Sequence, residues 1–134
     1  MYQIYIFGMG YVGLTLGVYA SSFYRVHGIE NNQKTAENIK KQSISIVDIG
    51  MRENLNRSLL NGTLSIYTSI KDAPLGKKNV FIITPGTPLD SSGAVSVDSI
   101  STITDELSQV VKKDDLIILR STVKVGTTEK LLVD

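Results

Sequence analysis

Gly8-Met9-Gly10-Tyr11-Val12-Gly13 is a GxGxxG motif, and its surroundings decide the fold. It stands between an apolar, β-rich stretch and an apolar stretch that predicts a helix, residues 2–7 and 11–22. In this context Gly8 permits a tight turn, Gly10 lets the backbone approach a pyrophosphate, and Gly13 lets the helix pack closely on the strand. The start of such a helix presents N–H groups to an anion. The motif predicts a dinucleotide-binding unit, the alternative being a glycine-rich packing turn.

A carboxylate follows at the end of the second predicted strand, residues 24–30. Glu30 lies 17 residues after Gly13, where a carboxylate can accept hydrogen bonds from the hydroxyls of an adenosine ribose. Its charge would repel a 2′-phosphate, so the pair of signals favours NAD over NADP. The alternative for Glu30 is a solvated residue at a strand end.

The rest of the chain continues to alternate predicted strands and helices. Asn31 or Asn32 can cap a helix that runs to about Lys41, and a later helix ends at Asn61-Gly62. The remaining strands are expected at residues 64–67, 79–84 and 116–122, and the remaining helices at 51–60, 97–113 and from 126 onward. This order predicts a Rossmann-like α/β fold, a doubly wound parallel sheet with helices on both faces. We expect residues 1–134 to form one NAD-binding domain, truncated because its last helix has hardly begun.

Composition narrows the possible functions. Lys and Arg total 14 against 13 Asp and Glu, giving a net charge of +1, so no strong field favours a nucleic-acid partner. The chain has no cysteine and one histidine, His27, so we expect no metal site and no catalytic residue here, and we expect His27 to be packed or half-exposed. The uncharged residues 1–24 contain four glycines and no basic start, which argues against a membrane span or signal peptide. A cytoplasmic protein without a membrane partner is expected.

Two further loops follow predicted strands, at residues 84–90 (TPGTPLD) and 120–128 (RSTVKVGTT). In a doubly wound sheet the ligand lies across the carboxyl ends of the strands, so both loops are candidates for contact with it. Either one alone could be an ordinary turn with Ser and Thr caps.

Taken together, the motifs resemble one family. The order GxGYVGL (residues 8–14), GIE (28–30), TPLD (87–90) and STVxxGTT (121–128) resembles the N-terminal domain of UDP-glucose/GDP-mannose dehydrogenases, and NGTLSIYTS (61–69) is similar to that family's link into its third strand. The resemblance covers essentially the whole chain. It implies NAD as the cofactor, with the following contacts: the main chain around Tyr11 and Val12 for the pyrophosphate, Glu30 for the adenosine ribose, and Thr87 and Thr122 for the nicotinamide half.

The chain departs from the family pattern at four places. Asp is usual where Glu30 stands, and a basic residue is common at position 35, which here is Thr35 with Lys34 before it. The family's Pro-Ile-x-Glu-Pro-Gly-Leu loop appears as SIVDIGM at residues 45–51, without its prolines, and Lys124 replaces a frequent proline.

The resemblance also implies an activity. Family members oxidise the C6 alcohol of a UDP- or GDP-sugar to the uronate in two NAD-dependent steps through a catalytic cysteine, a chemistry of polysaccharide biosynthesis. Because this chain has no cysteine, we expect it to be inactive alone and the nucleotide-sugar substrate to be bound mainly by other domains. We expect a homodimer for the full-length protein and a monomer for this chain. The alternatives are a stand-alone regulatory NAD(H)-binding module and the N-terminal domain of a hydroxyacid- or phosphogluconate-type dehydrogenase.

Overall fold

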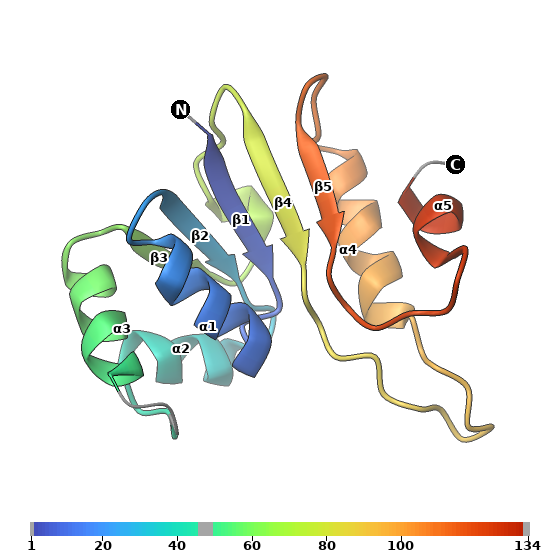
Figure 1. Ribbon diagram of the computed structural model, residues 1–134, viewed down its shortest axis with the longest axis horizontal. Coiled ribbons are helices and arrows are strands. Elements are labelled where there is room, and N and C mark those ends of the chain that lie inside the picture. Colours follow the sequence, from blue (N-terminus) through green and yellow to red (C-terminus); the bar gives the residue numbers. More distant parts are fainter. Residues whose placement is uncertain (1, 46–49, 133–134) are drawn as a thin grey trace.

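A parallel β-sheet forms the centre of the structure, a computed structural model that describes residues 2–45 and 50–132. Within these residues the strands lie in the order β3-β2-β1-β4-β5, and each neighbouring pair is parallel (Figure 1). Their bounds are β1 Gln3–Phe7, β2 Arg25–Ile29, β3 Leu64–Tyr67, β4 Asn79–Ile83 and β5 Leu116–Leu119. The central strands are buried along most of their length, which explains why their sequences are continuous apolar runs rather than alternating ones.

Helices cover both faces of the sheet (Figure 1). One face carries α1 Tyr11–Ala20, α2 Gln33–Lys40 and α3 Met51–Leu60, and the other carries α4 Asp98–Ser108 and α5 Thr127–Leu132. Alternate side chains of β1 serve the two layers: Ile6 belongs to the apolar cluster under α1 to α3, whereas Tyr5 and Phe7 belong to the cluster under α4. The predicted Rossmann-like doubly wound fold is confirmed.

The order of the strands creates a switch point between β1 and β4. From β1 the chain moves to β2 and β3 on one side, then crosses back through the short helix η1 Ile70–Asp72 to β4 and β5 on the other side. Connections that leave β1 and β4 in opposite directions open a crevice at their carboxyl ends, which is where ligands of such sheets bind.

Most of the predicted elements begin and end within two residues of the expected positions. The helix at residues 51–60 and the strand at 64–67 match α3 and β3. The amino-terminal cap of α2 is Asn32, whose side-chain oxygen accepts a hydrogen bond of 2.9 Å from the backbone N–H of Thr35. Of the family-like segment 45–51, residues 46–49 lie outside the described residues. No helix in the described part of the chain is long and apolar enough to cross a bilayer.

The expected carboxyl-terminal ends of one helix and one strand were wrong. The helix predicted for residues 97–113 ends at Ser108, because the N–H groups of Gln109 and Val110 bond only three residues back, to the carbonyls of Glu106 and Leu107, and close the helix as a turn. A second turn follows, in which Asp114 adopts a left-handed backbone (φ 73°) and Asp115 accepts a bond of 3.0 Å from the N–H of Lys112. The strand predicted for residues 116–122 ends at Leu119, because Ser121 turns away and donates a hydrogen bond of 2.7 Å to the carbonyl of Pro85.

Candidate cofactor-binding site

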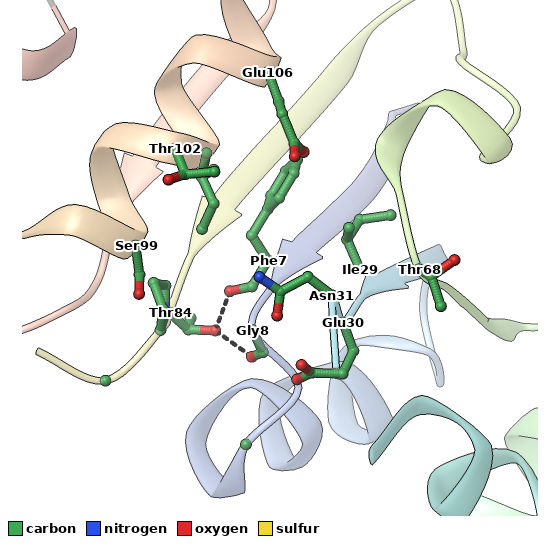
Figure 2. Close-up of a pocket in the computed structure, with 14 residues that line it drawn as sticks. Phe7, Gly8, Ile29, Glu30, Asn31, Thr68, Thr84, Ser99, Thr102 and Glu106 are labelled. Atoms are coloured by element: carbon green, nitrogen blue, oxygen red, sulfur yellow. Dashed lines mark hydrogen bonds between the residues drawn. The ribbon is translucent and has the colours of Figure 1, made fainter. Parts of the chain in front are cut away.

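A cleft of about 280 Å³ lies at the carboxyl ends of β1, β2 and β4, bounded by α4 on one side (Figure 2). Gly8, Gly10 and Glu30, three residues that sequence analysis singled out, line this cleft. Apolar side chains from the ends of β1 and β2 and from α4 form part of its wall: Phe7, Ile29 and Ile103. The volume lies near the lower limit of roughly 300 Å³ for small-molecule pockets, so it suits one half of a dinucleotide rather than the whole.

The loop after β1 is shaped by its glycines. Gly8 has a φ of 85°, which side-chain-bearing residues rarely adopt. A Cβ at Gly13 would overlap the carbonyl oxygen of Gly8 and lie 2.7 Å from Oγ1 of Thr84, whereas a Cβ at Gly10 would meet nothing within 4 Å. Gly13 therefore serves packing of α1 against the loop, and Gly10 keeps open the surface that borders the cleft.

The amino-terminal end of α1 points its backbone dipole toward this loop. Gly10 occupies the cap position, and the first turn has neither a side-chain cap nor an acidic residue to neutralise the helix end. Tyr11 and Val12 form that first turn, and their side chains are exposed. Such a helix end favours a negatively charged group.

Glu30 is held beside the glycine loop. Its side chain is 9% exposed, Oε2 accepts a hydrogen bond of 2.9 Å from the N–H of Met9, and Oε1 accepts one of 3.0 Å from the N–H of Asn32. The alternative of a solvated residue is therefore wrong. A carboxylate has about four acceptor positions, so two remain for the hydroxyls of a ligand.

Thr84, the first residue after β4, joins the two strands that border the switch point. Its hydroxyl lies 2.8 Å from the carbonyl oxygens of both Phe7 and Gly8 (Figure 2), and its side chain also lines the cleft. Sequence analysis included Thr84 only as the start of a loop. The sequence signal for this role is a residue with a hydroxyl group directly after a buried strand. In the structure that strand, β4, pairs with β1, the strand that precedes the glycine loop.

Thr87 and Thr122, predicted to serve the nicotinamide half, are brought together by the structure. The hydroxyl of Thr87 donates a hydrogen bond of 2.7 Å to the carbonyl of Thr122. This bond and the one from the hydroxyl of Ser121 to the carbonyl of Pro85 connect the loop after β4 to the loop after β5. Neither threonine lines the cleft, so the predicted residues divide into two groups on the carboxyl edge of the sheet.

The Asp of the TPLD segment stabilises a turn. Oδ1 of Asp90 accepts hydrogen bonds from the N–H of Ser92 at 2.8 Å, the hydroxyl of Ser92 at 2.6 Å and the N–H of Ala94 at 3.0 Å. These bonds hold the pKa of Asp90 below its usual range. Because Leu89 and Val95 pair as an antiparallel bridge around it, the segment forms a small hairpin in the long connection to α4.

One face of α4 was missed as part of the site. Ser99, Thr102, Ile103 and Glu106 line the cleft, and their spacing of three or four residues places them on one side of the helix. Sequence analysis expected a helix at residues 97–113 but assigned none of its residues to the site. Asn31 and Thr68, which follow β2 and β3, also line the cleft and were missed as well.

His27 lies inside the fold rather than in the cleft. It is 2% exposed, stacks on Tyr5 with 4.9 Å between ring centroids, and Nε2 lies 2.8 Å from Oε1 of Gln3. Burial lowers the pKa of its imidazole, with a smaller contribution from Arg25. The prediction of a packed side chain is confirmed. Across residues 2–45 and 50–132, no group of acidic, His or Cys side chains could hold a metal ion.

Comparison with known proteins gives one consistent family. A sequence model described as "UDP-glucose/GDP-mannose dehydrogenase family, NAD binding domain" matches residues 2–134. UDP-N-acetyl-D-mannosamine dehydrogenase of Campylobacter jejuni is 32% identical over 131 residues, covering 96% of this chain and 31% of that protein. UDP-glucose 6-dehydrogenase YwqF of Bacillus subtilis is 29% identical over 128 residues, 95% of this chain and 29% of that protein.

Solved structures agree with these relatives. UDP-D-ManNAc dehydrogenase from Pyrococcus horikoshii superposes with a TM-score of 0.86 at 29% identity, over 96% of this chain and 30% of that one. A ternary complex of GDP-mannose dehydrogenase from Pseudomonas aeruginosa superposes with a TM-score of 0.86 at 28% identity, over 97% of this chain and 30% of that one. This chain therefore spans about 30% of the length of the relatives it matches. With the glycine loop, the acid after β2 and the switch-point cleft all in place, the chain belongs to the UDP-glucose/GDP-mannose dehydrogenase family and corresponds to its NAD-binding domain.

Proposed function

We propose that residues 1–134 form one NAD-binding domain that serves a nucleotide-sugar 6-dehydrogenase, an enzyme that oxidises the C6 alcohol of a UDP- or GDP-sugar to the uronate in two NAD-dependent steps. The observation that carries the proposal is the buried carboxylate of Glu30, bonded to the glycine loop and retaining acceptor capacity toward the cleft. The family match over residues 2–134 favours this activity over a regulatory module or a hydroxyacid-type dehydrogenase.

Each part of the site has a role in this proposal. The first turn of α1, with the backbone of Tyr11 and Val12, binds the pyrophosphate at its positive end, and Gly8, Gly10 and Gly13 give the loop the shape that allows this approach. Glu30 accepts hydrogen bonds from the adenosine ribose hydroxyls and disfavours a 2′-phosphate. The linked loops that carry Thr87 and Thr122 orient the nicotinamide half.

The protein contributes binding and orientation, and NAD supplies the hydride acceptor. Because the chain contains no cysteine, the nucleophile and most of the nucleotide-sugar pocket would be provided by other domains of the enzyme. We further propose a cytoplasmic role in polysaccharide biosynthesis, a homodimeric full-length enzyme and a monomeric isolated chain. Light scattering of this chain at micromolar concentration should give the mass of one chain, and a dimer would contradict the last point.

Calorimetric titration of the chain with NAD and with NADP tests the central proposal. NAD should bind, NADP should bind clearly more weakly, and Glu30→Ala should lose about tenfold or more in NAD affinity, the scale of a charge-assisted hydrogen bond. Glu37→Ala, on the exposed side of α2, is the matched control and should bind as the original chain does. Well-folded protein that binds neither dinucleotide would refute the proposal.

A further inference from the structure

A second carboxylate lines the cleft, at the end away from Glu30. Glu106 projects from α4, and Figure 2 shows it on the opposite side of Phe7 from Gly8 and Glu30. Its side chain is half-buried. Within residues 2–45 and 50–132, no side chain or backbone N–H forms a hydrogen bond or an ion pair with this carboxylate.

The two carboxylates of the cleft therefore differ in their surroundings. Glu30 is compensated by two backbone N–H groups, whereas Glu106 has no such compensation in the described part of the chain. Enclosing a charged carboxylate between a bound ligand and the protein is unfavourable unless a donor satisfies it. A ligand that fills this cleft must present a hydrogen-bond donor at the Glu106 end, or its binding is weakened.

The chemistry of adenosine limits which donor this can be. The adenosine half of NAD, whose 5′ oxygen is esterified, carries three donor groups: the 2′- and 3′-hydroxyls of the ribose and the 6-amino group of the base. The ring nitrogens N1, N3 and N7 are acceptors. The hydroxyls face Glu30 in the proposed binding mode. The amino group is the donor that remains, and it lies at the far end of the nucleoside from the ribose.

We propose that Glu106 accepts a hydrogen bond from the 6-amino group of adenine and so selects an adenine dinucleotide over one with a 6-oxopurine base. The inference rests on the proposed NAD-binding function and names a specificity-determining residue within that site. Phe7, Ile29 and Ile103 supply apolar surface to the cleft, which contacts any purine and does not distinguish one from another. Selection between purines therefore requires a polar group such as Glu106.

We expect the cleft to discriminate between adenine and hypoxanthine because the two bases differ at position 6, where adenine has a hydrogen-bond donor and hypoxanthine an acceptor. Hypoxanthine places a carbonyl oxygen where adenine has its amino group, and an oxygen facing the Glu106 carboxylate would be repelled and left unpaired. Sites that hydrogen-bond a ligand group reject an analogue lacking it more strongly than apolar pockets reject a change of size. The N1–H of hypoxanthine is a donor, but the base would have to shift along the cleft to bring it to Glu106.

The test is a calorimetric titration with NAD and with nicotinamide hypoxanthine dinucleotide, on the original chain and two variants of α4. Glu106→Gln keeps the size of the side chain and offers both an acceptor and a donor, so it can satisfy either base. The matched control is Asp105→Asn, which removes a charge from the residue directly before Glu106. Asp105 is exposed and does not line the cleft.

We expect the original chain and Asp105→Asn to bind NAD about tenfold or more tightly than the hypoxanthine dinucleotide. Glu106→Gln should reduce this ratio to about threefold or less. If the original chain binds both dinucleotides equally, or if Glu106→Gln keeps the ratio, Glu106 does not recognise the amino group, while the proposed NAD binding stands. If folded protein, verified by circular dichroism, binds neither dinucleotide, both proposals fail.

Discussion

Oε2 of Glu30 lies 2.9 Å from the backbone nitrogen of Met9, so the acid directly after β2 is bonded to the glycine loop after β1. The bond explains why Glu30 is buried although it follows the last residue of a strand and carries a charge. It also means that this side chain shapes the loop in addition to any contact that it makes with a ribose.

Glu30→Gln separates these two roles. A glutamine oxygen can still accept the bond from Met9, but the amide NH2 then faces the N–H of Asn32 and that second bond is lost, together with the charge that we propose disfavours a 2′-phosphate. We expect the preference for NAD over NADP to fall by about tenfold and the free energy of unfolding to fall by about 1–3 kcal/mol, the cost of the bond lost at Asn32. Titration with both dinucleotides measures the preference. An unchanged preference would show that the charge of Glu30 does not discriminate between them.

Gly13→Ala and Gly10→Ala should affect different properties. A methyl group at Gly13 overlaps the Gly8 carbonyl, so we expect a loss of about 1–3 kcal/mol in the free energy of unfolding, the cost of overpacking. A methyl group at Gly10 meets no protein atom within 4 Å, so stability should hold. NAD binding should weaken, because the methyl group enters the space where we propose that the pyrophosphate binds. Urea unfolding and titration of both variants provide the comparison. Equal stability of the two variants would contradict the packing role of Gly13.

Thr84→Val keeps the shape of the side chain and removes its hydroxyl. The carbonyl of Phe7 retains a bond from the N–H of Thr84, but the carbonyl of Gly8 loses the hydroxyl that lies 2.8 Å away. We expect a decrease of about 1–2 kcal/mol in the free energy of unfolding, measured from the urea midpoint at unchanged slope. Thr84→Ser, which keeps the hydroxyl, should be close to the original chain, and an equal loss in both variants would assign the effect to the methyl group instead.

His27 should make stability depend on pH. Burial lowers the pKa of His27 in the folded state from its ordinary value of 6.5, so the unfolded chain binds the proton more readily. The contribution of the uncharged His27 to the free energy of unfolding is therefore fully present above pH 6.5 and is lost as the pH falls below that value. His27→Phe should flatten the pH dependence of urea unfolding in this window, with the carboxylates titrating alike in both proteins. Parallel curves for the two proteins would show that His27 does not titrate differently on folding.

The elements that carry the fold could be predicted because their signals are local. The glycine loop, the Asn32 cap and the α3–β3 segment are each specified by residues a few positions apart. The spacing of Glu30 after Gly13 makes it a candidate ribose ligand from sequence alone. Its bond to Met9 could not be predicted, since that bond depends on β2 lying beside β1.

The rest of the site depends on contacts between distant segments. Glu106 lines the cleft because α4 packs across the sheet, and nothing in the sequence near it distinguishes it from a solvated helix residue. The early end of β5 has a similar cause, because Ser121 and Thr122 are bonded to the loop that follows β4. Sequence pattern alone assigned these residues to a longer strand, whose apolar run does not reveal a partner 35 or 36 residues away.

The hydroxyl bond between Thr84 and Gly8 also has a consequence for the order of events during synthesis. The two residues are 76 positions apart, and parallel strands that pair over such separations form late relative to local helices. The first β-α-β unit can emerge from the ribosome and begin to fold with its glycine turn still lacking the contact from β4. Competence to hold a dinucleotide should thus arise in a single step when β4 docks on β1, so that a nascent chain ending before Thr84 would not yet retain the cofactor.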